Sequence, residues 1–565
     1  MELPPGIVYL ISCLPQLLLP PAIVYGLNRI CDFAFGVSLP GWSQIPVYVL
    51  SFPALFTCNV IAANYRDSRQ AAMHGAVLPP KFPSRWPGSL DILAALVQNF
   101  KIGYMGQVHS IFTAEPEYTK AILASKFTSF AKGPMFWDQV NSLLGTGVFN
   151  SDGDIHRSMT RPFFSKDRIS HFEIFDKHAE DAISQLKIRL REGYPVDFQD
   201  MVSRFTLDSA TEFLFGKDVC SLSAGLVYPP SSPRSKDVAF ENHPANKFAH
   251  AFSDAQIATA YRSRFGSAWR LSEFWTDRVK KHMDVCFKFI DPILKEALEK
   301  NKMLKENVDE KADAKDRDVK EGETLLDHLV NYTEDPIVIR DEILNIMIAG
   351  RDTTAATMTF VIYMLAQHPD VLRRLREEIL SKVGSSRRPT YDDMRDMKYL
   401  RAVINETLRL YPPVTSVEPT VWPGINGGKP IYIPPNTRYL RTPYSVFLMH
   451  RRTDLWGPDA QEFDPDRFLD DRLRKYCTPN PFIFVPFNAG PRICLGQQFA
   501  YNETSFFLVR LLQQFSSVST LPPTEWAKCS GRKAIEKVII KSHLTIYAHD
   551  GLWVRMGEAS PVEVV

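Results

Sequence analysis

Near its C-terminal end the chain reads Phe487-Asn488-Ala489-Gly490-Pro491-Arg492-Ile493-Cys494-Leu495-Gly496. Gly490 permits a turn that a side chain would oppose, and Gly496 permits the close approach of a helix expected to begin near Leu495. Cys494 then lies just before a helix N-terminus, where the helix dipole and the free amides favour a thiolate. Arg492 adds a cation nearby. The pattern predicts a thiolate suited to bind iron, and the alternative is an inert cysteine in a glycine-rich loop.

A second polar site interrupts an apolar helix expected over Arg340 to Gln367 and reads Ala349-Gly350-Arg351-Asp352-Thr353-Thr354. Gly350 costs about 1 kcal/mol relative to alanine in a helix interior. Thr353 and Thr354 can turn their hydroxyls onto backbone carbonyls one turn back and so loosen the helix. Such a helix would seat a hydroxyl and a carboxylate beside a ligand, and the alternative is a polar kink on a surface helix.

Together these sites resemble the cytochrome P-450 family, whose haem-binding signature has Phe, Gly, Arg, Cys and Gly at the spacing of residues 487–496. The resemblance implies haem b with its iron held by Cys494. It assigns Asp352 and Thr353 to proton delivery during dioxygen activation. It covers the chain from about Phe82 to the C-terminus and places six further residues beside the cofactor: Phe487, Gly490, Arg492, Gly496, Ala349 and Gly350.

Other stretches point within that family. Residues 143–150, which read Leu-Leu-Gly-Thr-Gly-Val-Phe-Asn, and residues 205–208, which read Phe-Thr-Leu-Asp, resemble fungal and plant members that hydroxylate alkanes and fatty acids. With an N-terminal anchor, the chain is most similar to membrane-bound fungal members that oxidise alkanes, fatty acids and aromatic xenobiotics. The substrate is therefore expected to be small and apolar.

Glu406 and Arg409 lie three residues apart on a helix expected over Tyr399 to Leu410, so their side chains can pair. Alone, such a pair is typical of a solvated surface. The resemblance adds Arg467, in the later segment 463–468, as a third member. We interpret the trio as structural support for the cysteine loop.

Two stretches depart from the family pattern. The family's helix before the haem usually carries Trp and, four residues later, Arg, whereas Gly153-Asp154-Ile155-His156-Arg157 contains no Trp, as if residues were missing. Arg157 is the best match for that Arg, and we expect it to bind the haem propionates together with Arg492. After Pro412-Pro413 the family usually supplies another cation, and residues 414–419 contain none.

Composition excludes several other classes of protein. The 565 residues carry 66 basic and 64 acidic side chains, so the net charge of +2 gives no signal for nucleic acid, and no such partner is expected. Eight cysteines without a CxxC pair indicate neither a disulfide scaffold nor a structural zinc site.

Two uncharged stretches, Leu3 to Asn28 and Phe33 to Tyr65, begin the chain. Ile45 to Ala63 would extend about 28 Å as a helix, close to the hydrocarbon thickness of a bilayer. The first stretch is interrupted by three prolines and is expected to span, re-enter or lie at the interface. We interpret residues 1–65 as a membrane anchor, and a buried apolar hairpin is the alternative. Basic residues follow and predict that the catalytic domain lies on the cytosolic side: Arg66, Arg69, Lys81 and Arg85. The resemblance implies that the membrane is that of the endoplasmic reticulum.

The rest of the chain is expected to form one body. Residues 66–88 contain a proline-rich elbow, and residues 89–565 the haem-thiolate catalytic domain. Helical periodicity dominates, as over Ser170–Arg191, Ser272–Lys300 and Ala500–Phe515, and strand-like runs are short, so the fold class is mainly α with a small β portion. Residues 221–246 are predicted to be a mobile surface connection. The resemblance implies the cytochrome P-450 fold.

The resemblance further implies a monooxygenase that uses O2. The residues after the cysteine loop are too few for a flavin or nicotinamide module, so electrons are expected from a separate NADPH-dependent reductase. Candidates for its basic docking surface are Arg373, Arg374, Arg376, Arg451 and Arg452. Two other functions remain open, a haem-binding protein without turnover and a haem-thiolate isomerase, although neither requires the proton relay predicted at Asp352 and Thr353.

Overall fold

The computed structural model describes residues 3–78, 113–125, 127, 132–151, 159–164, 172–306, 323–414, 444–521 and 538–560. The chain forms two compact units. One contains residues 1–111, 261–278 and 419–442, and the other contains residues 112–260, 279–418 and 443–565.

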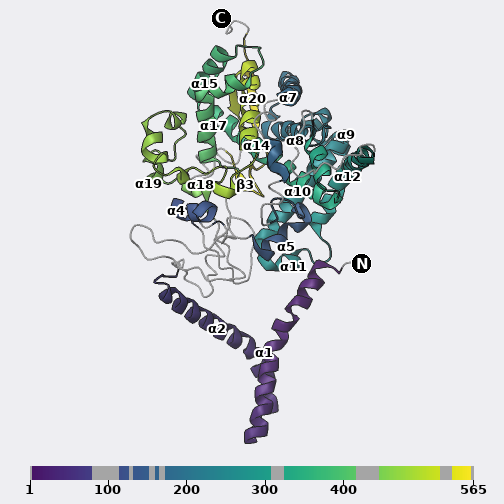
Figure 1. The fold of residues 1–565 in the computed structure, drawn as a ribbon, viewed down its shortest axis with the longest axis vertical. Coiled ribbons are helices and arrows are strands. Elements are labelled where there is room, and N and C mark those ends of the chain that lie inside the picture. The colour runs from purple at the N-terminus through teal and green to yellow at the C-terminus, as the bar shows by residue number, and fades with distance from the viewer. Residues whose placement is uncertain are drawn as a thin grey trace. The chain divides into compact units, whose positions relative to one another are not determined.

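The first unit contains two long apolar helices, α1 (Pro5–Phe35) and α2 (Gly41–Met73), drawn in purple in Figure 1. It also contains the segment 261–278 with the short helices η8 (Gly266–Ala268) and α11 (Trp269–Ser272). The expectation that prolines interrupt the first stretch is wrong, because α1 continues through Pro15, Pro20 and Pro21. Each proline removes only one backbone donor, and the neighbouring residues keep the helix continuous.

The second unit is built mainly of helices. The longer ones are α5 (Gly133–Leu144), α7 (Glu173–Arg191), α8 (Phe198–Phe215), α10 (Pro244–Phe265), α12 (Arg278–Glu306), α13 (Leu325–Tyr332), α14 (Pro336–Gln367), α15 (Pro369–Lys382), α17 (Lys398–Leu410) and α20 (Gln497–Gln514). The shorter ones include α4 (Pro116–Lys120), α9 (Val238–Asn242), α16 (Tyr391–Asp396), α18 (Val446–Met449) and α19 (Thr453–Trp456). The helices α10 and α12 begin or end within the segment 261–278.

Two small antiparallel sheets complete the described residues. One has the strand order β1 (Val196–Asp197), β5 (Trp553–Glu558), β2 (Phe515–Thr520), and the other pairs β3 (Ile540–Ser542) with β4 (Ile546–Ala548). The predicted mainly-α class with a small β portion is therefore confirmed.

The core of the second unit is organised around α14. Side chains such as Ile343, Met347, Phe360 and Leu365 on this helix are fully buried. The helix packs against α8, α17 and α20 (Figure 1). A helix that is apolar on all sides must be covered on all sides, which explains its central position.

One expected helix bound is wrong. The helix expected from Ser272 to Lys300 begins at Arg278 as α12, where the carboxylate of Glu273 accepts a hydrogen bond from the backbone N–H of Arg278 (2.8 Å). The connection 221–246 is held at its start, since the buried carboxylate of Asp208 accepts from the backbone N–H groups of Ser221 (2.7 Å) and Leu222 (2.9 Å), and its predicted mobility stays a prediction.

Candidate functional site

The cysteine loop is held in a tight turn by its own backbone. The N–H of Cys494 donates to the carbonyl of Phe487 (2.9 Å), and the N–H of Ile493 donates to that of Gly490 (3.0 Å). Gly490 has φ +59°, and a Cβ atom there would collide with the carbonyl oxygen of Leu123. Glycine is therefore required at 490 for two reasons, the left-handed backbone and the close neighbour.

Cys494 is exposed to a cavity of about 670 Å³. The cavity is lined by Arg161, Pro162, Phe164, Gly490, Pro491, Ile493, Cys494 and Leu495. The following helix, α20, starts at Gln497, slightly later than expected, with Gly496 as its N-cap residue. A Cβ atom at Gly496 would lie 3.8 Å from Phe164, so the described neighbours leave room for a side chain there.

The side chains around this cavity fit a haem. A cysteine thiolate is a ligand for haem iron. A guanidinium such as that of Arg161 can pair with a propionate carboxylate. The other lining residues are largely apolar and suit the porphyrin ring. Of the predicted propionate partners, Arg157 lies outside the described residues.

Arg161 was not among the residues predicted to bind the haem. It belongs to the short helix η4 (Arg161–Phe164) and is exposed at the cavity. No local pattern marked it, because its place at the cavity depends on packing against the distant cysteine loop.

Phe487 and Arg492 are both placed by aromatic contacts. The ring of Phe487 lies 5.1 Å from that of Tyr501 on α20 and packs against the main core. The guanidinium of Arg492 lies 4.8 Å from the ring centre of Phe127. Phe487 thus packs the start of the loop against α20, while Arg492, within the loop, contacts Phe127.

The polar site of α14 has the predicted back-bonded threonine. The hydroxyl of Thr353 donates to the carbonyl of Ala349 (2.6 Å), which places both residues on one face of the helix. The guanidinium of Arg351 donates to one carboxylate oxygen of Asp352 (3.1 Å). The other oxygen of Asp352 is buried and has no partner among the described residues. A Cβ atom at Gly350 would lie 3.7 Å from Ala210 of α8, so this glycine faces α8.

A buried carboxyl group lies behind this polar site. Glu503 on α20 is fully buried, and burial raises its pKa well above the ordinary value, an effect that the hydroxyl of Thr354 partly opposes. The helix α20, which follows Cys494, packs against α14, and Glu503 lies near Thr354, the residue after Thr353.

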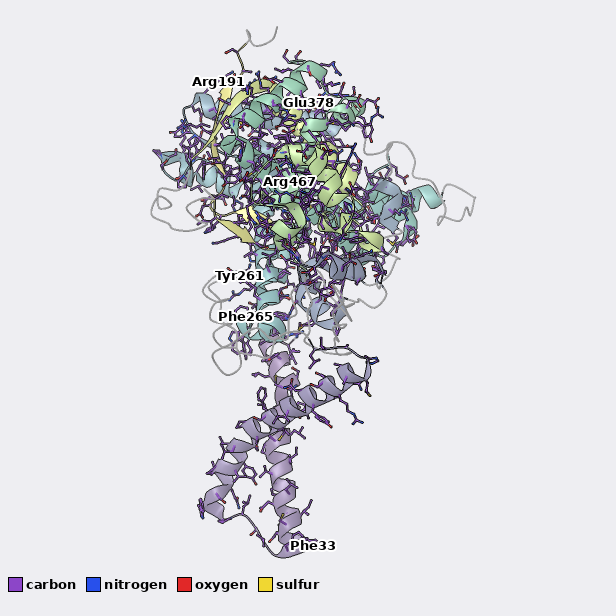
Figure 2. The ribbon with its side chains drawn as sticks, turned by 90° about the vertical axis from the view of Figure 1, so that its left-hand side faces the viewer. Phe33, Arg191, Tyr261, Phe265, Glu378 and Arg467 are labelled. Atoms are coloured by element: carbon purple, nitrogen blue, oxygen red, sulfur yellow. The ribbon has the colours of Figure 1, made fainter. Side chains whose placement is uncertain are left out.

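The predicted trio is present and fully buried (Arg467 is labelled in Figure 2). Glu406 accepts two hydrogen bonds from Arg409 (2.7 Å each) and one from Arg467 (3.3 Å). Arg409 also donates to the carbonyl of His450 (2.7 Å), and the ring of His450 accepts from the N–H of Val485 (3.1 Å). A continuous set of hydrogen bonds therefore joins the trio to the residues just before the cysteine loop.

Most of the arginines predicted to dock a reductase are engaged within the chain. Arg374 pairs with Asp466 (2.7 Å), Arg376 donates to the carbonyl of Leu512 (3.2 Å), and Arg451 is buried. Arg452 pairs with Glu115 and Asp454 (2.5 Å each). Such pairs present little net positive charge to a partner.

Comparisons with known proteins point to one family. The family model described as Cytochrome P450 matches residues 97–532. The chain is 37% identical over 426 residues to Cytochrome P450 52E1 of Candida apicola. This aligned region covers 73% of this chain and 76% of that protein. It is 38% identical over 438 residues to Cytochrome P450 52A1 of Candida tropicalis, with 74% of each chain covered. The solved cytochrome P450DA heme domain has a TM-score of 0.60 at 20% identity, covers 86% of this chain and 99% of that chain, and is alike in fold.

Proposed function

Because the chain belongs to the cytochrome P450 family, we propose that Cys494 holds the iron of haem b in an enzyme that hydroxylates apolar substrates. The family comprises monooxygenases that bind haem iron through a cysteine thiolate, use dioxygen and receive electrons from a redox partner. The chain is thus an oxidoreductase.

The observation that carries the proposal is the exposed thiol of Cys494 in the cavity that also contains Arg161. The bound haem supplies the iron at which dioxygen is reduced and one oxygen atom enters a C–H bond. The turn at Gly490 fixes the direction of the thiol, and the amides at the start of α20 stabilise its negative charge. Arg161 would neutralise a propionate at the same cavity, as would Arg157 and Arg492.

The polar site of α14 would hold and move protons. The carboxylate of Asp352 keeps one buried oxygen free of described partners, so it can accept a proton or a water molecule. Rotation of the Thr353 side chain would release its hydroxyl from Ala349 and allow it to donate. Ala349 and Gly350 complete this stretch of the helix, and Ala349 shares the face of Thr353.

The N-terminal helices support a membrane-bound enzyme. Both are long and apolar enough to cross a bilayer. The proposed organisation has residues 1–65 as anchor, 66–88 as elbow and 89–565 as the catalytic domain, which faces the cytosol from the endoplasmic reticulum. The proposed electron donor is an NADPH-dependent reductase, and the proposed substrates are alkanes, fatty acids and aromatic xenobiotics, which concentrate in membranes.

Replacement of the ligand tests the proposal. Reduced protein with carbon monoxide should show the red-shifted band of thiolate-bound haem, and Cys494→Ser should abolish it. Cys477→Ser is the control, because this half-buried cysteine lies in η11 (Leu473–Cys477), outside the lining of the cavity. Equal loss of the band in both variants would contradict the assignment.

A further inference from the structure

A tight connection, residues 36–40, joins α1 to α2. Gly36 has φ +62°, and its N–H and that of Val37 donate to the carbonyls of Asp32 (3.0 Å) and Cys31 (3.4 Å), so α1 ends with a glycine in the left-handed conformation. The side chain of Asn28 accepts from the N–H of Leu39 (2.8 Å). So short a connection makes the two helices antiparallel neighbours, and they pack against each other. Figure 2 shows Phe33 at this end of the pair.

Both helices expose apolar side chains along their length. Leu18 and Leu27 on α1 are 62% and 57% exposed, and Ile45 and Ile61 on α2 are 75% and 63% exposed. Hardly any of the most apolar window of either helix is buried. With 31 and 33 residues, each helix is about 46–50 Å long, more than the hydrocarbon core of about 30 Å. An uncovered helix that is apolar on all sides is suited to lipid.

The N-terminal end of α1 is attached to the segment 261–278. The N–H of Gly6 donates to the carbonyl of Phe274 (2.9 Å), and Gly6 lies so close to the Phe274 ring that a Cβ atom would collide with it. The segment is itself braced, because buried Arg262 donates to both carboxylate oxygens of Glu273 (2.9 and 2.6 Å). It continues without interruption into α10 and α12. A bilayer that α1 enters must therefore leave the start of this helix on the side of the segment 261–278, from which α10 and α12 continue.

The distribution of charge agrees with this arrangement. At the connecting end, Arg29 and Asp32 form an ion pair (3.9 Å) and contribute no net charge. At the other end of α2, Arg66 and Arg69 exceed the single acid Asp67. Excess positive charge remains on the cytosolic side of membranes.

We propose that α1 and α2 cross the bilayer twice as a helical hairpin, with the N-terminus and the catalytic chain on one side and residues 36–40 on the other. The inference rests on the proposed membrane anchoring and adds its topology. In a single-span anchor formed by α1 alone, the start of α1 and the catalytic chain would lie on opposite sides of the bilayer. That arrangement requires the contact between Gly6 and Phe274 to break.

Cysteine labelling in sealed microsomes tests the topology on the otherwise unaltered chain. Cys31 is exposed near the connection. A membrane-impermeant maleimide should label it only after the membrane is permeabilised, with Cys31→Ser giving the background from other cysteines. Labelling of Cys31 in sealed vesicles would overturn the hairpin, since both a single-span α1 and a surface-lying hairpin expose this residue to the cytosol.

Glycosylation provides an independent measurement. A long flexible spacer with an N-glycosylation acceptor, inserted between Val37 and Ser38, should be glycosylated, while the same spacer fused before Met1 should not. The reverse result would overturn the proposal. The reduced carbon monoxide band shows whether each variant is folded and tests the haem assignment separately. Release of the unmodified chain by alkaline washing would contradict membrane anchoring itself, and the hairpin with it.

Discussion

Glu406 on α17 and Asp352 on α14 are both carboxylates on core helices, and their surroundings differ. Glu406 has partners on both oxygens, from Arg409, Arg467 and the N–H of Asp464 (3.0 Å). Asp352 has one oxygen paired with Arg351 and the other without a partner among the described residues. A buried polar atom without a partner costs free energy. Glu406 therefore suits a structural role, because both of its oxygens have partners. Asp352 suits proton transfer, because one of its oxygens can still accept a hydrogen bond.

The largest effect is expected when the buried trio of Glu406, Arg409 and Arg467 is broken. Glu406→Ala leaves the guanidinium groups of Arg409 and Arg467 buried without their carboxylate, which costs about 3–5 kcal/mol. We expect little folded haem protein, measured by the reduced carbon monoxide band and by thermal unfolding. Glu558→Ala, which removes an exposed partner of Arg191, should change neither. Normal yield of Glu406→Ala would show that the trio is dispensable.

The next largest effect is expected on proton delivery by Thr353. Thr353→Ala should keep haem and substrate binding but divert electrons from product to peroxide. The loss of a positioned proton donor typically lowers the rate by about 10²–10⁴-fold. The measurement is the ratio of product formed to NADPH consumed. Thr357→Ala, one turn further along α14, removes a comparable back-bonded hydroxyl and should leave this ratio unchanged. Equal ratios in all three proteins would place proton delivery elsewhere.

A smaller effect is expected at the cavity of Cys494. Arg161→Ala should release part of the haem during gel filtration, because a propionate would lose a charged partner. Arg161→Lys should retain more haem than Arg161→Ala. The matched control is Arg191→Ala, on the surface of α7 and paired with Glu558. Full haem retention in Arg161→Ala would show that other cations are sufficient to bind the propionates. Arg157 and Arg492 are the proposed ones.

The smallest effect is a dependence of stability on pH. Burial, reinforced by the charge of Arg409, lowers the pKa of His450 to about 3. The unfolded chain has a pKa of about 6.5 at this residue. Between about pH 6.5 and 3 only the unfolded state binds the proton, so the free energy of unfolding falls as the pH falls. His450 adds no slope above that range.

Substitution isolates this contribution. Urea unfolding between pH 7 and pH 5 should show a weaker acid dependence in His450→Gln than in the unaltered protein, by up to one proton. His549→Gln serves as the control, because this histidine is partly exposed. The same slope in all three proteins would mean that His450 is protonated in the folded state too.

Much of the helical framework could be predicted from the sequence. The helices expected over Ser170–Arg191 and Tyr399–Leu410 correspond to α7 and α17, and the described bounds differ by a few residues at most. Local periodicity is sufficient there, because each helix buries one apolar face. It was insufficient at the start of α12, where the side chain of Glu273 accepts from the N–H of Arg278 and the helix begins there rather than at Ser272.

The sequence by itself determined the cysteine motif, its turn at Gly490, the back-bonded Thr353 and the two apolar N-terminal stretches, since each depends on residues close together along the chain. Only the tertiary structure decided that Arg161 shares a cavity with Cys494 and that His450 links the trio to the cysteine loop. The attachment of Gly6 to Phe274 was also decided there. Such contacts join residues far apart in the chain, and whether they form depends on packing of the whole unit rather than on local preference.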